Sequence, residues 1–156
     1  MKISIRKADL SDWEMIQELN NEVFIADAEY DPYLDLDWPF PESGISYYKD
    51  KIKDPKTCCL IAEDKANNQP IGYLFASEVS YPYRKLKIIE LENMGVTSNY
   101  RSKGIGTLLL NYFREWSKKR EFDTIYVNVY FVNKKVSKFY SKNGFTPRDM
   151  ILESKI

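Results

Sequence analysis

The sequence of 156 residues contains no histidine and only two cysteines. Without histidine, the chain cannot carry Ser-His-Asp or Cys-His catalysis, and the common histidine metal sites are excluded as well. The cysteines, Cys58 and Cys59, are adjacent in an apolar segment, which fits neither a disulfide framework nor a zinc pattern. We therefore expect buried strand thiols, no metal centre and a cytoplasmic protein.

Net charge and long apolar runs are absent too. The 23 basic and 23 acidic side chains cancel, which argues against a nucleic-acid binder. The charge is unevenly distributed, because residues 1–50 hold 12 acids and 4 bases and so carry −8, while residues 51–156 carry +8. No stretch of about 18 apolar residues exists, so we expect no membrane span. The first six residues alternate between apolar and polar or charged side chains and contain no apolar segment of the kind that a signal peptide needs, so we expect no signal peptide either.

The apolar pattern switches between the periods of strands and helices, which indicates one α/β domain over residues 1–156. The pattern predicts strands over residues 2–8, 57–64, 69–80, 86–96, 124–130 and 146–155. It predicts helices over residues 12–24, 46–53, 104–119 and 134–142. The long connection over residues 25–44 is rich in acids and aromatics. Loops of this length are usually functional or disordered, and its aromatics argue against disorder.

A glycine-bearing turn, Arg101-Ser102-Lys103-Gly104-Ile105-Gly106, separates a predicted strand from a predicted helix. The first amides of a helix have no intrahelical partner and carry partial positive charge. Two glycines leave space beside those amides, and the two basic side chains add charge. The turn therefore predicts an anion site suited to a pyrophosphate, with a plain strand-to-helix turn as the alternative. Neither a Walker loop nor a dinucleotide fingerprint fits the spacing.

A second motif follows one strand later. Asn133 is a good N-cap for the helix predicted over residues 134–142, and Gly144 is a helix-ending residue. The two motifs together resemble the GNAT superfamily of acyl-CoA-dependent N-acyltransferases. The matching residues are Arg101-x-x-Gly104-x-Gly106, then Asn133, Tyr140 and Gly144-Phe145 at the family's spacing. The resemblance covers residues 2–156 and implies a mixed, mostly antiparallel central sheet flanked by helices. One departure is Val136, where the family often has alanine.

The resemblance implies direct transfer of an acetyl group from acetyl-CoA to an amine in a ternary complex. It places Tyr140 as general acid near the thioester sulfur, with a core tyrosine as the alternative. It places a carboxylate base at Glu90. Glu92 lies two residues on, hence on the same strand face, and two ordinary solvated glutamates are the alternative. The residues implied in coenzyme A binding are Met94, Gly95, Val96, Arg101, Ser102, Lys103, Gly104, Ile105, Gly106, Thr107, Asn133 and Tyr140.

The acceptor amine is expected under the connection at 26–44 and the turn at 81–85. Acidic side chains suit a cationic amine, and aromatic rings could enclose it. The candidate contacts are Tyr30, Asp35, Asp37 and Trp38, with a solvated acidic face as the alternative. The sequence leaves open a protein or peptide amine as acceptor, a non-catalytic acyl-CoA-binding module, and assembly as a homodimer.

Overall fold

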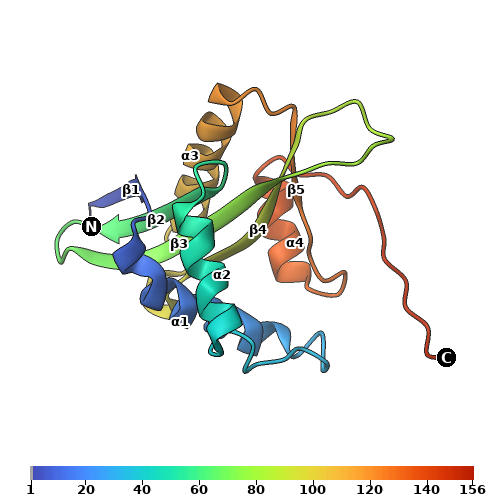
Figure 1. Cartoon of the computed structure of the whole chain (residues 1–156), viewed down its shortest axis with the longest axis horizontal. Coiled ribbons are helices and arrows are strands. Elements are labelled where there is room, and N and C mark those ends of the chain that lie inside the picture. The colour runs from blue at the N-terminus through green and yellow to red at the C-terminus, as the bar shows by residue number, and fades with distance from the viewer. Residues whose placement is uncertain (1) are drawn as a thin grey trace.

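A five-stranded sheet in the order β1-β2-β3-β4-β5 forms the centre of the computed structural model, which describes residues 2–156 (Figure 1). The strands are β1 (Ile3–Lys7), β2 (Cys58–Asp64), β3 (Gln69–Val79), β4 (Ile88–Val96) and β5 (Thr124–Val127). The first four pair antiparallel in chain order, and β5 pairs parallel to β4. This arrangement confirms the mixed, mostly antiparallel sheet.

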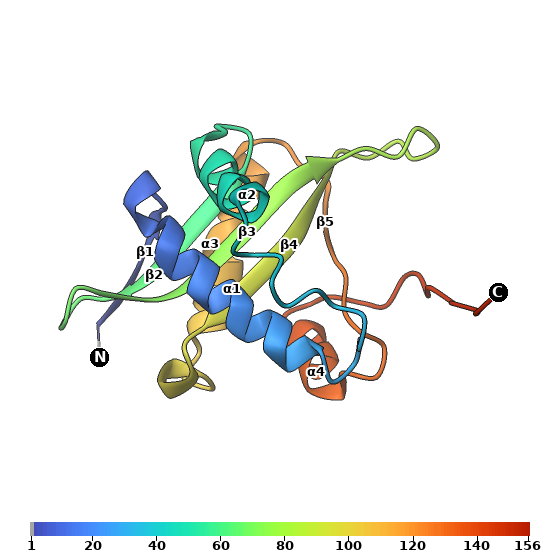
Figure 2. The ribbon, with the colours of Figure 1, turned by 60° about the horizontal axis from the view of Figure 1, so that its bottom comes forward.

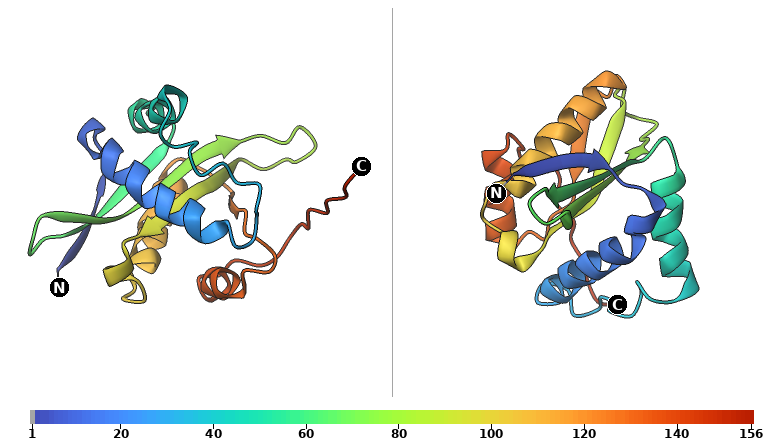
Figure 3. Two further views of the ribbon diagram at one scale, coloured as in Figure 1. Left: turned by 90° about the horizontal axis from the view of Figure 1, so that it is seen from below. Right: turned by 90° about the vertical axis from the view of Figure 1, so that its left-hand side faces the viewer.

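Helices cover both faces of the sheet (Figures 2 and 3). Helices α1 (Trp13–Asp27) and α2 (Glu42–Lys53) lie on one face. Helices α3 (Ile105–Lys119) and α4 (Lys134–Lys142) pack against the other. Two short 3₁₀ turns, η1 (Leu10–Asp12) and η2 (Ser98–Tyr100), precede α1 and α3.

The strands divide their side chains between two apolar layers because successive residues point to opposite faces. Cys58 and Leu60 of β2 join the cluster beneath α3, whereas Cys59 and Ile61 join the cluster beneath α1 and α2. Both cysteines are 1% exposed, which confirms the buried strand thiols. Burial raises the pKa of both thiols, so they stay protonated and unreactive at neutral pH.

A β-bulge in β4 interrupts this alternation. Phe75 of β3 pairs with Asn93, but its neighbour Ala76 pairs with Leu91, so Glu92 is an extra residue on β4. As a result Glu92 and Asn93, although consecutive, both face α1 and α2, where each has hydrogen-bond partners. Met94 then returns to the α3 and α4 side. Bulges re-aim side chains in this way and occur often beside functional sites.

Most predicted elements match the structure within a few residues. The helix predicted over 134–142 is α4, and the strands predicted from 57 to 96 are β2, β3 and β4. Helix α1 begins after η1, whose N-cap is Asp9, and it continues three residues past the predicted end at 24. Helix α2 begins four residues before the predicted start at 46, and β5 ends three residues before 130.

The predicted final strand is wrong. Residues 146–156 form no strand, and all of them are exposed. Their apolar side chains, Met150, Ile151 and Leu152, are consecutive rather than alternating, so a strand here would present apolar groups on both faces. Nothing within residues 2–156 covers either face, and no sheet hydrogen bond forms.

Candidate active site

Strands β4 and β5 separate partway along their length. Strand β5 pairs with β4 only from Ile88 to Leu91, whereas β4 pairs with β3 as far as Val96. Within residues 2–156, positions 92–96 of β4 therefore have no strand partner on the β5 side, which we call the free edge of β4. At the end of this edge the Val96 carbonyl accepts a hydrogen bond from the Arg101 side chain. A free strand edge presents a row of backbone N–H and C=O groups that can pair with another extended chain.

A cavity of about 510 Å³ lies beside this part of β4 on the face of α1 and α2. Its lining combines carboxylates, carboxamides and aromatic rings from α1, the loop after α1, α2, β4 and the residue after β5. The lining residues are Asn20, Phe24, Trp38, Tyr47, Glu90, Glu92, Asn93 and Asn128. The volume and the mixed lining are typical of a small-molecule site.

Glu92 is fully engaged with α2. Its carboxylate accepts hydrogen bonds from the Tyr47 hydroxyl at 2.6 Å and from the Lys51 ammonium at 2.5 Å. Burial alone would raise the pKa of Glu92, but the hydrogen bonds from Lys51, Tyr47 and Ser77 outweigh burial and lower it. Glu92 is therefore an ionised, paired carboxylate that is poorly suited to accept a proton.

Glu90 lines the same cavity without such partners. Within residues 2–156 no side chain or backbone group hydrogen-bonds to its carboxylate. Burial raises the pKa of Glu90, the negative charge of Glu92 raises it further, and the Lys51 ammonium opposes the shift. A carboxylate with free oxygens and a raised pKa is suited to accept a proton. The structure thus separates two glutamates that the sequence could not tell apart.

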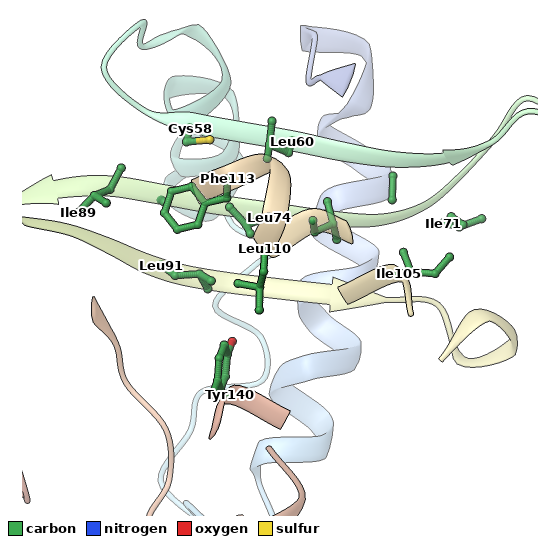
Figure 4. Close-up of a cluster of buried hydrophobic side chains, with 13 residues drawn as sticks. Cys58, Leu60, Ile71, Leu74, Ile89, Leu91, Ile105, Leu110, Phe113 and Tyr140 are labelled. Atoms are coloured by element: carbon green, nitrogen blue, oxygen red, sulfur yellow. The ribbon is translucent and has the colours of Figure 1, made fainter. Parts of the chain in front are cut away.

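Tyr140 lies on the other face of the sheet, in the apolar cluster beneath α3 and α4. It is 8% exposed, and its ring packs edge-on against Phe139 and Phe145 with centroids 5.1 and 5.2 Å away. Figure 4 shows Tyr140 extending from α4 toward β4, with the hydroxyl at the end nearer the strand. Burial raises the pKa of this hydroxyl, and the charge of Asp27 adds to the shift, so it keeps its proton at neutral pH.

The turn before α3 has the backbone of an anion site. Gly104 is the N-cap with φ of +82°, and a side chain added there would meet nothing within 4 Å. The first amide to bond within the helix is that of Leu108, which donates to the Gly104 carbonyl at 3.0 Å. The amides of Ile105, Gly106 and Thr107 have no acceptor within residues 2–156. Their donors are therefore unused.

Gly106 has a different role from Gly104. A Cβ atom there would lie 3.0 Å from the Phe139 ring and 3.7 Å from the Met94 methyl group. The missing side chain thus allows α3 to approach α4 closely. The sequence predicts that both glycines leave space for a phosphate. The structure leaves such space at Gly104, whereas Gly106 lies against Phe139.

The two basic side chains of the turn also differ. Arg101 donates to the Val96 carbonyl at 2.8 Å and pairs with Glu22 at 2.9 Å, so it connects the end of β4 to α1. Lys103 is exposed, with its ammonium 5.3 Å from the centre of the Tyr100 ring. Lys103 can therefore turn toward an anion, while Arg101 holds the turn in place. Ser102 has a φ of +62° and is exposed.

Asn133 has the local role that its position predicts. Its side-chain oxygen accepts a hydrogen bond from the Val136 amide at 3.1 Å and so caps α4. At the other end, Gly144 with φ of +83° ends the helix and lets Phe145 fold back against Tyr140. The second motif thus fixes the helix that carries Tyr140.

Of the four predicted acceptor contacts, only Trp38 lines the cavity, where its ring packs against Phe24 and Tyr47. Tyr30 stacks on Tyr130 with ring centroids 5.9 Å apart. Asp35 accepts the Asp37 amide at 3.0 Å within an exposed turn, and neither carboxylate lines the cavity.

Sequence reasoning missed the polar network of the cavity. The Asn20 side chain donates to the Asn93 carboxamide at 2.8 Å and accepts from the Tyr48 hydroxyl at 2.6 Å. The Tyr73 hydroxyl also donates to Asn93, at 2.8 Å. One signal was available, because Asn20 lies four residues after Ile16 on the apolar face of α1 and so predicts a buried polar group.

Neither a metal cluster nor a membrane helix is found in the part of the chain that the structure describes. Residues 2–156 hold no group of three or more cysteine, aspartate or glutamate side chains that could bind a metal ion. No helix over the same residues is long and apolar enough to cross a membrane.

Residues 13–145 match the model of the Acetyltransferase (GNAT) family. A protein of Drosophila melanogaster, named as probable N-acetyltransferase san, is 29% identical over 133 residues, which are 85% of this chain and 61% of that protein. The chain spans between about a third and three fifths of the length of the curated relatives that it matches.

Two solved structures are similar over nearly their whole length. A crystal structure of a mutant BH1408 protein from Bacillus halodurans has a TM-score of 0.85 and 21% identity, with 98% of this chain and 99% of that chain covered. AAC(6′)-Iy in complex with the bisubstrate analogue CoA-S-monomethyl-acetylneamine has a TM-score of 0.76 and 14% identity, with 100% and 99% covered. At these identities the likeness shows a shared fold.

Proposed function

The chain belongs to the GNAT acetyltransferase family, and from that premise we propose that it transfers an acetyl group from acetyl-CoA to a primary amine. The observation that carries the proposal is the free edge of β4 over residues 92–96. This edge runs from the cavity that holds Glu90 to the turn that starts α3. One extended ligand could therefore contact both. We further propose that residues 1–156 act as one cytoplasmic domain.

The residues present fit acetyl-CoA. The open amides of Ile105, Gly106 and Thr107, with Lys103 beside them, suit a pyrophosphate. The free edge at 92–96 suits the amide-bearing pantetheine arm, which could pair with it like a strand. The residues we assign to this binding are Met94, Gly95, Val96, Arg101, Ser102, Lys103, Gly104, Ile105, Gly106, Thr107, Asn133 and Tyr140. Among them Arg101 and Asn133 act mainly by fixing the backbone.

Acetyl-CoA supplies an activated acetyl group and a thiolate leaving group. The chain must remove a proton from the amine and return one to the sulfur. Glu90, with free oxygens and a raised pKa, accepts the proton of the amine directly or through a water molecule. The buried Tyr140 hydroxyl keeps its proton at neutral pH and donates it to the sulfur. Glu92 stays paired with Lys51 and helps to shape the cavity.

The side chains that line the cavity favour direct transfer in a ternary complex. The cavity lining contains no cysteine or serine, and both cysteines of the chain are buried in β2 with raised thiol pKa values. We therefore assign direct attack by the amine rather than a covalent acyl-enzyme route.

We propose that the acceptor is a small cationic amine. The cavity of about 510 Å³ offers the unpaired carboxylate of Glu90 together with the rings of Phe24, Trp38 and Tyr47. A carboxylate flanked by aromatic faces favours a cation. Tyr30, Asp35 and Asp37 lie outside this lining, so we assign them to the approach of the amine rather than to its final contact.

A screen of primary amines tests this function, with release of free CoA as the readout. We expect turnover with small cationic amines and none with their N-acetylated forms. A peptide N-terminus or peptide lysine as the best acceptor would replace the small amine as substrate. Acetyl-CoA binding by calorimetry, with no turnover on any small amine or peptide, would establish the non-catalytic binding module instead.

A further inference from the structure

The side chain of Asn93 ends a chain of hydrogen bonds that begins in the core beneath α1 and α2. The Tyr48 hydroxyl donates to the Asn20 oxygen at 2.6 Å, and the Asn20 amide donates to the Asn93 oxygen at 2.8 Å. The Tyr73 hydroxyl donates to the same Asn93 oxygen at 2.8 Å. Tyr48 and Tyr73 are both fully buried, so the hydroxyls that start this network are shielded from water.

The direction of the network follows from Tyr48. Its hydroxyl has no hydrogen-bond partner other than Asn20 within residues 2–156, so its proton can go only to the Asn20 oxygen. If the Asn20 carboxamide were reversed, the Tyr48 hydroxyl would be a buried donor without an acceptor, which is costly. The nitrogen of Asn20 must therefore point to Asn93, and Asn93 must present its oxygen in return.

The nitrogen of Asn93 is left open to the cavity. The Asn93 oxygen already accepts hydrogen bonds from Asn20 and Tyr73, whereas its N–H groups have no acceptor within residues 2–156. The nitrogen is not enclosed by protein, and Asn93 lines the cavity of about 510 Å³. The site therefore offers a hydrogen-bond donor of fixed orientation that the described chain does not itself use.

Two backbone features hold Asn93 in this position. The β-bulge at Glu92 turns Asn93 to the side of β4 on which the cavity lies. Gly95 leaves space for the Tyr73 ring, because a Cβ atom at residue 95 would lie 2.7 Å from that ring. The Tyr73 hydroxyl can therefore reach the Asn93 oxygen. The carboxamide is held from β3 by Tyr73 and from α1 by Asn20, and α1 lies over β3 and β4 on this face (Figure 2).

We propose that Asn93 selects acceptor amines that carry a neutral oxygen close to the amino group, by donating a hydrogen bond from Nδ2 to that oxygen. The inference rests on the proposed acetylation of an amine and narrows the class of substrate. Glu90 and Asn93 lie three residues apart on β4, so their backbone positions are at most about 10 Å apart. A small ligand can therefore place its amine at Glu90 and its oxygen at Asn93.

The chemistry of the cavity defines this oxygen. An ether, hydroxyl or carbonyl oxygen can accept from the Asn93 nitrogen. A second ammonium group would meet N–H donors there and find no acceptor. A carboxylate would lie close to the negative charge of Glu92 and to Glu90, which disfavours it. Small amines with one cationic group and a neutral oxygen are therefore the best match.

Matched pairs of amines test the contact, with kcat/KM from CoA release as the readout. A methoxyalkylamine carries an oxygen that only accepts hydrogen bonds, and an alkylamine of equal length carries a methylene group in its place. The two differ in basicity, but this difference is the same for every protein variant. A change in the ratio of their kcat/KM values between variants therefore reports on the protein.

Asn93→Asp is the informative variant. It keeps an oxygen for Asn20 and Tyr73 and replaces the donor that faces the cavity by an acceptor. At the chain length that suits the unmodified protein best, the methoxyalkylamine to alkylamine ratio should fall by at least about threefold, since a hydrogen bond is lost. A methoxy compound and an amino acid N,N-dimethylamide offer an ether and a carbonyl oxygen, and the larger fall identifies which oxygen the site prefers.

Two further variants complete the test. Asn128→Asp adds the same charge to the same cavity, and Asn128 has no hydrogen bond to the network within residues 2–156. It should change the rates of both amines by a similar factor and keep their ratio. Tyr73→Phe adds no charge and removes one of the hydrogen bonds that orient Asn93, so it should lower the ratio even if Asn93→Asp does not fold.

Dissociation constants of the same amines, from NMR titration, separate this proposal from the proposed function. An Asn93-dependent preference for the methoxyalkylamine in binding, without turnover of any amine, would support the oxygen contact and contradict acetyl transfer. Turnover with a ratio that is the same in the unmodified protein, Asn93→Asp and Tyr73→Phe would overturn the role of Asn93 and leave acetyl transfer standing. A fall of equal size in Asn128→Asp would also overturn it, because charge alone would then explain the result.

Discussion

Tyr140 differs from a phenylalanine at the same position by one hydroxyl group, which can donate a proton. Tyr140→Phe keeps the packing against Phe139 and Phe145, so the fold should be unchanged. If Tyr140 is the general acid, kcat should fall by about 10²–10⁴-fold, the usual contribution of positioned acid–base catalysis. The dissociation constant of acetyl-CoA, measured by calorimetry, should stay within about twofold, because binding rests mainly on backbone groups.

Tyr112→Phe is the control, since this tyrosine on α3 is 47% exposed and has no proposed role. Its kcat should match that of the unmodified protein. Full activity in a folded Tyr140→Phe variant would assign Tyr140 to the core alone.

Glu90 predicts a pH dependence with a definite sign. A base must be deprotonated to act, so kcat/KM should rise as the pH rises through the pKa of Glu90. Burial and the charge of Glu92 raise that pKa above the ordinary 4.5, which moves the acid limb of the profile to higher pH. Lys51→Met removes the cation that opposes this shift, so the limb should move further up.

Two substitutions isolate the charge of Lys51. Lys51→Arg keeps the cation and should restore the original pH profile. Lys49→Met removes a neighbouring lysine that stacks on Trp13, and it should leave the profile unchanged. A limb that is unmoved by Lys51→Met, or that persists in Glu90→Gln, would mean that another group is the base.

The distinction between Glu90 and Glu92 shows where sequence reasoning reaches its limit at this scale. The pair could be predicted because the residues lie two apart in a predicted strand. Their unequal roles depend on Tyr47 and Lys51 of α2, which pair with Glu92 from more than 40 positions away in the chain. The bulge that turns Asn93 into the same cavity also leaves no local sequence signal.

At the scale of elements, the start of α3 should bind the pyrophosphate of acetyl-CoA. Gly104→Val places a branched side chain in the open space before the helix, so the dissociation constant should rise by at least about tenfold, or 1.4 kcal/mol. A residue other than glycine at this positive φ also costs about 1–2 kcal/mol of folding free energy. Calorimetry and thermal unfolding measure the two effects separately.

Gly106→Ala is the informative comparison, because its Cβ would press on Phe139 rather than fill the open space. We expect a lower melting temperature with a smaller loss of acetyl-CoA affinity than in Gly104→Val. An unchanged affinity for acetyl-CoA in Gly104→Val would show that the pyrophosphate does not bind at this turn.

Elements with strong local signals were predictable. Helix α4 has both ends encoded, by the Asn133 cap and by Gly144, and the prediction and the structure agree over 134–142. Strand β5 is shorter than its alternating pattern, because pairing stops where it separates from β4. The strand predicted over 146–155 does not form, because it meets no pairing partner within residues 2–156.

At the scale of the whole molecule, the uneven charge predicts a salt effect. Residues 1–50, with a charge of −8, supply α1, the acidic loop and part of the cavity. Opposite charges speed encounter, and salt screens them over a Debye length of about 8 Å at physiological ionic strength. The kcat/KM for a cationic amine should therefore fall as salt rises, with acetyl-CoA held saturating.

Asp35→Asn with Asp37→Asn tests the source of this effect, since both carboxylates are exposed and lie outside the cavity. The double variant should reduce the salt dependence of kcat/KM more than it reduces kcat. The account would be contradicted by a salt dependence that the double substitution leaves unchanged, or by a best substrate that is anionic or neutral. Either result would mean that Asp35 and Asp37 belong to a solvated acidic face and do not attract the substrate.

The most direct test follows the acetyl group itself. The protein is incubated with acetyl-CoA labelled in the acetyl group and with the best amine from the screen, and the amine is analysed by mass spectrometry. We predict labelled amide and free CoA in equal amounts, at rates that fall sharply in Glu90→Gln. CoA release without labelled amide would contradict acetyl transfer, and the same rate in Glu90→Gln would contradict the role of Glu90 as the base.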